Sequence, residues 1–388
     1  MGMIGGIVDW GNRPLESRRL FAMSRSMILQ GSCEQKAYIH GGCGLFQHTA
    51  SYEHNDRRAL PLTLQRNQKL YTLLLDGAVQ GCGPLEGLGS EFCGNENDEW
   101  ILHAYLSFGT ELPRFLQGSF ALAVLDEHRG ELFLARNSLG ASPLFYAEED
   151  HSLLFSSEIK GILHALPSVA RIDVGALRAH LISPCGAFNG GALYRDIASL
   201  PSGSGRLFTP LGLTKFSWEP PETVDSSSDR GELPSTYYPD VDETSRMLGE
   251  ILYAFDYPQF DHWMPSFLHH LEQAHSLGRH HLTIYDPSLC VDLQYAAERA
   301  DRLGGLTDCS VKILPPPSPT TREKDLRKYE RVLRELLNSS DTHVLRQLFG
   351  VRWSDSIPEE KNTAKRIRRL GMLYQTILWV ERYPLLLQ

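Results

Sequence analysis

The stretch Gly118–Leu163 reads GSFALAVLDEHRGELFLARNSLGASPLFYAEEDHSLLFSSEIKGIL, in which short apolar runs alternate with turn-forming residues. Two runs, Ser119–Leu125 and Glu131–Arg136, flank a loop that contains glycine. Two further runs, Leu144–Ala147 and Leu153–Ser157, flank a polar loop. Paired runs rich in Phe, Leu and Val around such loops are typical of β-hairpins. The stretch therefore predicts four antiparallel strands.

A helix is expected directly after the fourth strand. Glu158–Leu163 begins this helix, and Ser156 or Ser157 is a suitable N-cap residue. Four antiparallel strands followed by a helix predict one sheet layer. Such a layer needs a partner layer that buries its apolar face, so a second sheet or helical layer is expected elsewhere in the chain.

The same stretch resembles the end of the glutaminase domain of asparagine synthetases in residue order, spacing and type. The matching segments are GSFA at 118–121, Asp126, LARNSLG at 134–140, PLFY at 143–146 and SEIK at 157–160. That domain is a class II glutamine amidotransferase, an N-terminal-nucleophile fold of two stacked antiparallel sheets between helical layers. The resemblance thus implies an α+β protein with an N-terminal αββα sandwich over residues 1–218.

The rest of the chain resembles a shortened synthetase domain. Residues 219–241 have the Pro- and Ser-rich composition of a linker, and 242–388 resemble a reduced, mostly helical remnant of the α/β synthetase domain. Within the remnant, amphipathic patterns predict helices over Lys324–Leu337 and Thr363–Tyr383. The family's Ser-Gly-Gly-x-Asp-Ser motif, which holds pyrophosphate at a helix N-terminus, does not occur in the sequence. No nucleotide-binding residues are therefore assigned.

The family's catalytic nucleophile is a cysteine whose thiolate attacks the glutamine amide while its own α-amino group acts as the base. Here Gly2 stands at that position, at the start of a predicted first strand, and Cys33 is the first cysteine in the sequence. The reaction needs a thiol and an α-amino group on one residue, so an internal cysteine cannot replace it. No catalytic residue is therefore predicted.

The remaining glutamine-site positions also depart from the family's pattern. A predicted strand over 70–75 ends in Asp76, Gly77 and Ala78, where the family has Asn-Gly-Glu. The family's asparagine side chain and glycine amide form the oxyanion hole, and its glutamate binds the substrate amino group. Asp76 supplies no N–H donor when ionised, Ala78 removes the amine anchor, and Gly77 keeps the turn. The family's next acidic position corresponds to Asn97 or Asp98, and both also suit a helix cap before a helix over 99–108.

Two other family features are missing. The arginine that holds the glutamine carboxylate has no counterpart, because Arg57 and Arg58 lie in a polar stretch that predicts a solvated loop. The usual Asp-Arg pair is replaced by Asn137 and Ser138. Several losses together indicate a site that no longer handles free glutamine, while the fold persists because its core does not depend on those polar groups.

The composition limits the class of protein. A net charge of −9 argues against a nucleic-acid partner, and no run approaches 18 apolar residues, so no membrane span is expected. The N-terminal region has no basic segment followed by an apolar stretch, so no secretory signal is expected. Seven scattered cysteines fit reduced thiols in the cytoplasm, and no histidine spacing predicts a metal site.

Three functional hypotheses follow from the resemblance. The favoured one is a non-catalytic scaffold or subunit whose partner is a full-length synthetase, with self-association as an open alternative and no cofactor. The second is an ATP-dependent amide-forming ligase that acts on a peptide or small acid, as in β-lactam synthetases and lasso-peptide cyclases, with ATP and Mg²⁺ as implied cofactors. The third, glutamine-dependent asparagine synthesis, is opposed by Gly2 and by the absent pyrophosphate motif.

Overall fold

The structure is a computed structural model, and it describes most but not all of the chain. The described residues are 2–11, 13–27, 33–50, 61–82, 98–137, 142–166, 170–182, 193–218, 239–255, 264, 268–269, 272, 281–285, 310–314, 323–349, 363–382 and 385–387. They form two compact units. The first comprises residues 1–167, 189–192 and 196–227, and the second comprises 168–188, 193–195 and 228–388.

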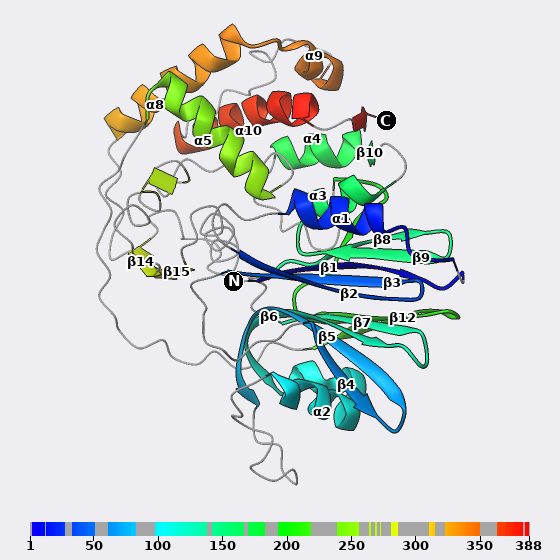
Figure 1. Cartoon of the computed structure of the whole chain (residues 1–388). Coiled ribbons are helices and arrows are strands. Elements are labelled where there is room, and N and C mark those ends of the chain that lie inside the picture. The colour runs from blue at the N-terminus through cyan, green and yellow to red at the C-terminus, as the bar shows by residue number, and fades with distance from the viewer. Residues whose placement is uncertain are drawn as a thin grey trace. The chain divides into compact units, whose positions relative to one another are not determined.

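The first unit contains two antiparallel six-stranded sheets stacked face to face (Figure 1). The first sheet has the order β11-β8-β9-β1-β3-β2. Its strands are Ala198–Ser199 (β11), Phe145–Glu149 (β8), Ser152–Ser156 (β9), Gly2–Asp9 (β1), Cys43–Ala50 (β3) and Cys33–His40 (β2). The second sheet has the order β13-β12-β7-β6-β5-β4. Its strands are Gly212–Ser217 (β13), Ser204–Thr209 (β12), Glu131–Arg136 (β7), Leu116–Asp126 (β6), Lys69–Cys82 (β5) and Leu62–Arg66 (β4).

Helices cover the outer faces of both sheets. In Figure 1, α1 (Ser17–Ser26) and α3 (Ile159–Ala165) lie on the first sheet, whereas α2 (Glu99–Phe108) lies on the second and continues into the 3₁₀ helix η3 (Gly109–Arg114). The order helix, sheet, sheet, helix confirms the αββα sandwich that the resemblance implies. Amphipathic helices bury their apolar faces against sheets in this way because neither layer can bury its apolar surface alone.

Alternation along the strands produces two separate cores. Residues of one parity lie between the sheets, among them Ile4, Leu74 and Phe155, and residues of the other parity pack under α2, among them Leu75 and Phe120. Side chains of a strand point alternately to opposite faces, so strands of the second sheet such as β5, β6 and β7 contribute to both cores. This explains why β6 and β7 are apolar at nearly every position between Phe120 and Leu125 and between Leu132 and Ala135.

The two predicted hairpins form, but they do not lie in one sheet. The strands β6 and β7 pair in the second sheet, whereas β8 and β9 pair in the first. The prediction of a single four-stranded layer is therefore wrong. Hairpin pairing is decided by neighbouring residues and their turn, while the choice of sheet is decided by what the apolar face of each hairpin meets.

Two element boundaries and one predicted helix cap also differ from the predictions. The strand β5 does not end at Asp76 but continues to Cys82, with a register shift between Val79 and Gly81. The helix α3 begins at Ile159 after the N-cap residue Glu158, and no side-chain cap bond forms there. The predicted cap Ser157 instead bonds to other strands, because its hydroxyl is buried next to β1 and β5.

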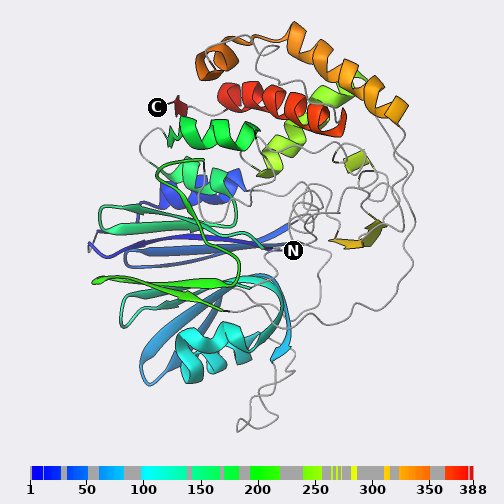
Figure 2. The ribbon, with the colours of Figure 1, turned by 180° about the vertical axis from the view of Figure 1, so that it is seen from behind.

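The described part of the second unit is mostly helical (Figure 2). Its helices are α4 (Val174–Ile182), α5 (Val241–Phe255), α8 (Glu323–Ser339), α9 (His343–Phe349) and α10 (Thr363–Arg382). Helices α5, α8 and α10 pack on one another, so the predictions of helices over 324–337 and 363–383 are confirmed. Two parallel strands, β14 (His281–Tyr285) and β15 (Ser310–Leu314), also occur in this unit. Within the described ranges, no helix is both long and apolar enough to cross a membrane.

The second unit also contains two short paired strands. The strand β10 (Ala170–Ile172) pairs in parallel with β16 (Leu385–Leu387). Residues 168–188 and 193–195 thus belong by contact to the second unit, although they precede residue 218 in the sequence.

Candidate functional site

Position 2 is the first residue of β1, which is an inner strand of the first sheet. Gly2 pairs with Thr49 of β3, and Ile4 pairs with Gln47. Position 2 has the same parity as Ile4, which is buried in the core between the sheets. The strand register therefore places position 2 on the inter-sheet side of β1, and the sequence of β1 contains no cysteine there.

Asp76 comes from β5 in the opposite sheet and is buried. It has the parity of Leu74, which also lies between the sheets. Its Oδ2 atom accepts a hydrogen bond of 2.8 Å from the Ser157 hydroxyl. A carboxylate oxygen is thus directed at a hydroxyl donor, at the position where the resemblance places an N–H donor for an oxyanion.

Ser157 connects this carboxylate to the first strand. Its Oγ atom accepts a 3.1 Å bond from the Ile4 amide, and its own amide donates to the Ile4 carbonyl at 2.9 Å. The chain of bonds from Ile4 through Ser157 to Asp76 joins β1 to β5 across the space between the sheets. Since the partners are buried, each bond also removes a desolvation penalty that an unpaired polar group would carry.

A second polar link lies beside the first. The Gln47 amide nitrogen donates to the Leu75 carbonyl at 2.8 Å, and the Leu75 amide donates to the Gln47 Oε1 atom at 3.1 Å. Gln47 belongs to β3 in the first sheet and Leu75 to β5 in the second. Sequence reasoning missed both Gln47 and Ser157. The detectable signal is a polar residue at a core-facing position of an otherwise apolar strand.

Gly77 keeps a conformation that favours glycine. Its φ angle is 89°, in the left-handed region, while it still pairs with Phe120 of β6. A residue with a Cβ atom would be strained there. Ala78 follows it in β5, opposite Ser119. Gly77 thus keeps the family's residue type and a conformation that favours glycine, while Asp76 and Ala78 on either side differ from the family's pattern.

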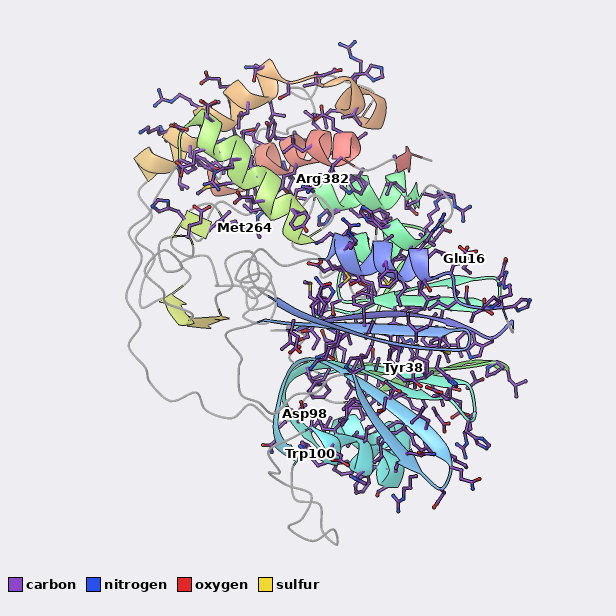
Figure 3. All side chains as sticks on the ribbon, viewed as in Figure 1. Glu16, Tyr38, Asp98, Trp100, Met264 and Arg382 are labelled. Atoms are coloured by element: carbon purple, nitrogen blue, oxygen red, sulfur yellow. The ribbon has the colours of Figure 1, made fainter. Side chains whose placement is uncertain are left out.

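The acidic position before α2 is only partly described. Asp98 is the N-cap residue of α2, as predicted, and the Ile101 amide donates to its carbonyl at 3.1 Å. Its side chain makes no cap hydrogen bond, although a capping role was one of the two expectations. Asp98 and Trp100, labelled in Figure 3, lie in the helical layer outside the second sheet. Asn97, Arg57, Arg58 and Ser138 lie outside the described residues.

Asn137 has a structural role at the end of β7. Its amide donates to the Phe120 carbonyl at 3.1 Å, its side-chain nitrogen donates to the Gly118 carbonyl, and its carbonyl accepts from the Gly203 amide at 2.9 Å. Asn137 therefore joins the ends of β6, β7 and β12. Each of these three bonds joins Asn137 to a backbone group.

The described thiol does not offer a substitute nucleophile. Cys43 is half-buried at the start of β3, and burial raises the pKa of its thiol to about 11, with Glu127 and Asp9 adding to the rise. Since the thiolate is the nucleophile, a thiol with so high a pKa is unreactive near neutral pH. The nearby Tyr38, labelled in Figure 3, also has a raised pKa because of burial and its hydrogen bond to Glu127.

The chemistry available at the glutamine-site positions is therefore limited. The described residues there supply a carboxylate, a hydroxyl and backbone amides, and these bond to one another. Among the described residues, no group of histidine, cysteine and acidic side chains is arranged to hold a metal ion. The arrangement can join the two sheets but contains neither a thiol nor a side-chain amide at positions 2 and 76.

The first 218 residues match a known protein family, and parts of the chain are similar to individual proteins. A family model described as a glutamine amidotransferase domain matches residues 1–218. Asparagine synthetase [glutamine-hydrolyzing] 3 of Bacillus subtilis (strain 168) is 36% identical over 117 residues, which are 29% of this chain and 19% of that protein. Asparagine synthetase B of Escherichia coli (strain K12) is 26% identical over 181 residues, 45% of this chain and 32% of that protein. The chain thus matches less than a third of the length of either relative.

Solved structures show a more distant similarity. The structure titled as the allosteric regulatory enzyme of purine biosynthesis aligns with a TM-score of 0.41 at 12% identity, covering 84% of this chain and 69% of that chain.

Proposed function

Because the chain belongs to the glutamine amidotransferase domain family and is asparagine-synthetase-like, we propose that it is a member that does not hydrolyse glutamine and acts as a non-catalytic scaffold or subunit in the cytoplasm. The observation that carries the proposal is the bond from the Ser157 hydroxyl to the Asp76 carboxylate. It gives the oxyanion position a structural acceptor in place of a donor.

The charge of the Asp76 side chain supports the same conclusion. In class II amidotransferases, the tetrahedral intermediate places negative charge at the oxyanion position, where preorganised donors stabilise it. An ionised Asp76 would place like charge there instead. Removing one oxyanion donor alone costs about 10² to 10³ in rate. Loss of the covalent nucleophile costs on the order of 10⁶ in a well-studied protease, about 8 kcal/mol of barrier.

The proposal is tested by ammonia release from glutamine. We expect none above the uncatalysed background from the natural chain. The triple variant Gly2→Cys, Asp76→Asn, Ala78→Glu, expressed with Met1 removed, restores the three family groups on a backbone whose Gly77 conformation is preserved. Its matched control carries Gly2→Ala with the same two other changes. Ammonia release by the triple variant above this control supports the assignment of the site, whereas turnover by the natural chain overturns the proposal.

As a scaffold, the chain needs a partner, and we propose a full-length synthetase of the same family. The support is that residues 1–218 match a glutamine amidotransferase domain and are similar to glutamine-hydrolysing asparagine synthetases. The measurement is binding between the purified chain and a purified glutamine-hydrolysing asparagine synthetase, with the effect on its ammonia transfer as a second readout. Absence of binding at micromolar concentrations of both proteins would count against this partner.

The alternative function is an ATP-dependent amide-forming ligase. The parallel pair β14–β15 favours it, since parallel strands are typical of α/β domains. The residues do not fit ATP, however, because the sequence lacks the pyrophosphate-binding motif. A ligand at 100 times its dissociation constant stabilises a protein by about 2.7 kcal/mol. We therefore expect no shift of the melting temperature with ATP and Mg²⁺, and a clear rise would favour the ligase.

A further inference from the structure

A segment from the first half of the chain completes the second unit. This segment, called the strap here, consists of β10, α4 and residues 193–195. In the sequence, it is preceded by α3 and followed by β11, and both of these belong to the first unit. The chain therefore leaves the first unit, contributes the strap to the second, and returns.

Backbone bonds hold the strap together and join it to the C-terminal strand. Ala170 and Ile172 pair with Leu385 and Leu387 of β16. The Asp173 amide donates to the Leu193 carbonyl at 2.9 Å, and the Asp173 carboxylate accepts from the Ala176 amide, which caps α4. The strap is thus a defined piece of structure with both a strand and a capped helix.

Side chains attach the strap to α10. The Trp379 indole nitrogen donates to the Tyr194 hydroxyl at 2.9 Å, and the two rings meet edge to face with centroids 5.7 Å apart. Both side chains are almost completely buried. Helix α4 also contacts α9 and α10, and its Leu177 is fully buried. A buried aromatic pair with a satisfied polar end is among the stronger contacts available to such a surface.

We propose that the strap makes the second unit depend on the first half of the chain, so that the two halves remain joined without a covalent link. Residues 228–388 lack the strand that β16 pairs with and the tyrosine that satisfies Trp379. If that piece were alone, the buried face of α10 and one backbone edge of β16 would meet water. The first half therefore acts as a built-in partner of the second.

The experiment cleaves the intact, folded protein between residues 225 and 230, at an inserted site for a sequence-specific protease. The two pieces are then followed by size-exclusion chromatography. We expect them to elute together. Separation of the natural pieces, with the C-terminal piece still folded by circular dichroism, overturns the proposal.

A matched pair of variants isolates the strap. Tyr194→Phe removes the hydroxyl that accepts the hydrogen bond from Trp379. That bond joins the two pieces. Tyr374→Phe removes a bond of 2.8 Å to the Ser245 hydroxyl, and both of its partners lie in the C-terminal piece. One neutral hydrogen bond is worth about 1 kcal/mol, or about fivefold in an equilibrium constant. Pieces with Tyr194→Phe should dissociate about fivefold more readily than those with Tyr374→Phe, and equal dissociation overturns the role of the strap.

Discussion

The hairpin stretch 118–163 and the glutamine-site positions lie in the same sandwich but differ in what the sequence has kept. In the stretch, the residue types match the family and most strand side chains are buried in one of the two cores. At the site, Gly2, Asp76 and Ala78 all depart from the family's pattern. A fold depends on buried apolar area that is spread over many residues, whereas catalysis depends on a few polar atoms.

The difference has a structural consequence at Asp76. A carboxylate buried between two sheets is costly unless it is hydrogen-bonded. Ser157 supplies a bond, and the same hydroxyl also satisfies the Ile4 amide. Asp76, whose residue type differs from the family's pattern, thus forms part of the connection between the sheets. The change of residue type at this position is compatible with the fold.

The largest expected effect lies in the stretch. Phe120 is fully buried under α2, and Phe120→Ala should cost about 3 to 5 kcal/mol through lost burial and the cavity it leaves. Denaturant unfolding at pH 7 measures the change. The control Leu211→Ala alters a side chain that is 99% exposed and should stay within about 0.5 kcal/mol. A loss below 1 kcal/mol for Phe120→Ala would contradict the assignment of stability to this region.

The second-largest expected effect concerns the polar link between Gln47 and Leu75. Gln47→Leu leaves the Leu75 amide and carbonyl without their side-chain partner, and each unsatisfied buried group costs about 1 to 3 kcal/mol. We expect a loss of about 2 to 4 kcal/mol in unfolding free energy. The same change at an exposed strand position, Gln65→Leu in β4, is the control. Equal effects at both positions would show that the link contributes nothing.

The third effect is a pH dependence of the unfolding free energy, which arises from His48 in β3. Burial lowers the pKa of His48 from 6.5 to about 4, and its Nε2 atom lies 2.8 Å from the Ser24 hydroxyl. Between these two pKa values the unfolded chain binds the proton and the folded chain does not, so stability falls as pH falls from about 6.5 towards 4. The contribution lost between pH 7 and pH 5 is about 2 kcal/mol.

The variant His48→Gln isolates this contribution. It removes the titrating group, so its unfolding free energy should fall less than that of the natural chain between pH 7 and pH 5. Denaturant unfolding of both proteins at the two pH values gives the difference. If both lose the same amount, His48 is not the group responsible.

The smallest expected effect is at the site itself. Asp76→Asn retains an oxygen that can accept from Ser157, so the unfolding free energy should change by less than about 1 kcal/mol. Ser157→Ala removes the donor to Asp76 and the acceptor for Ile4, and should cost about 1 to 3 kcal/mol. A larger loss for Asp76→Asn than for Ser157→Ala would mean that Ser157 is not the partner that matters.

Local pattern was sufficient for several parts of this fold. The two hairpins, the helix Glu99–Phe108 and the helices α8 and α10 follow from turn residues and apolar periodicity, which act between neighbours in the sequence. The departures at Gly2, Asp76 and Ala78 are likewise visible in the sequence, because they are changes of residue type within a recognisable segment.

Tertiary structure decided what local pattern cannot express. The pairing of β6 with β7 is local, but their separation from β8 and β9 into a different sheet depends on which apolar faces meet after the chain has folded. Ser157 has the residue type of a helix cap and sits at the right place for one. Its hydroxyl bonds instead to Ile4 and Asp76, which are 153 and 81 residues away in the sequence.

The same distinction applies to the division into units. Composition marks a break near residue 219, where prolines and serines accumulate and apolar residues become few. The composition contains no sign that residues 170–182 and 193–195 pack with α10 and β16, because those contacts join segments that are far apart in the sequence. Sequence alone determined the kinds of elements and the residue types at positions 2, 76 and 78. Which elements share a core was decided only when distant apolar and polar surfaces came together.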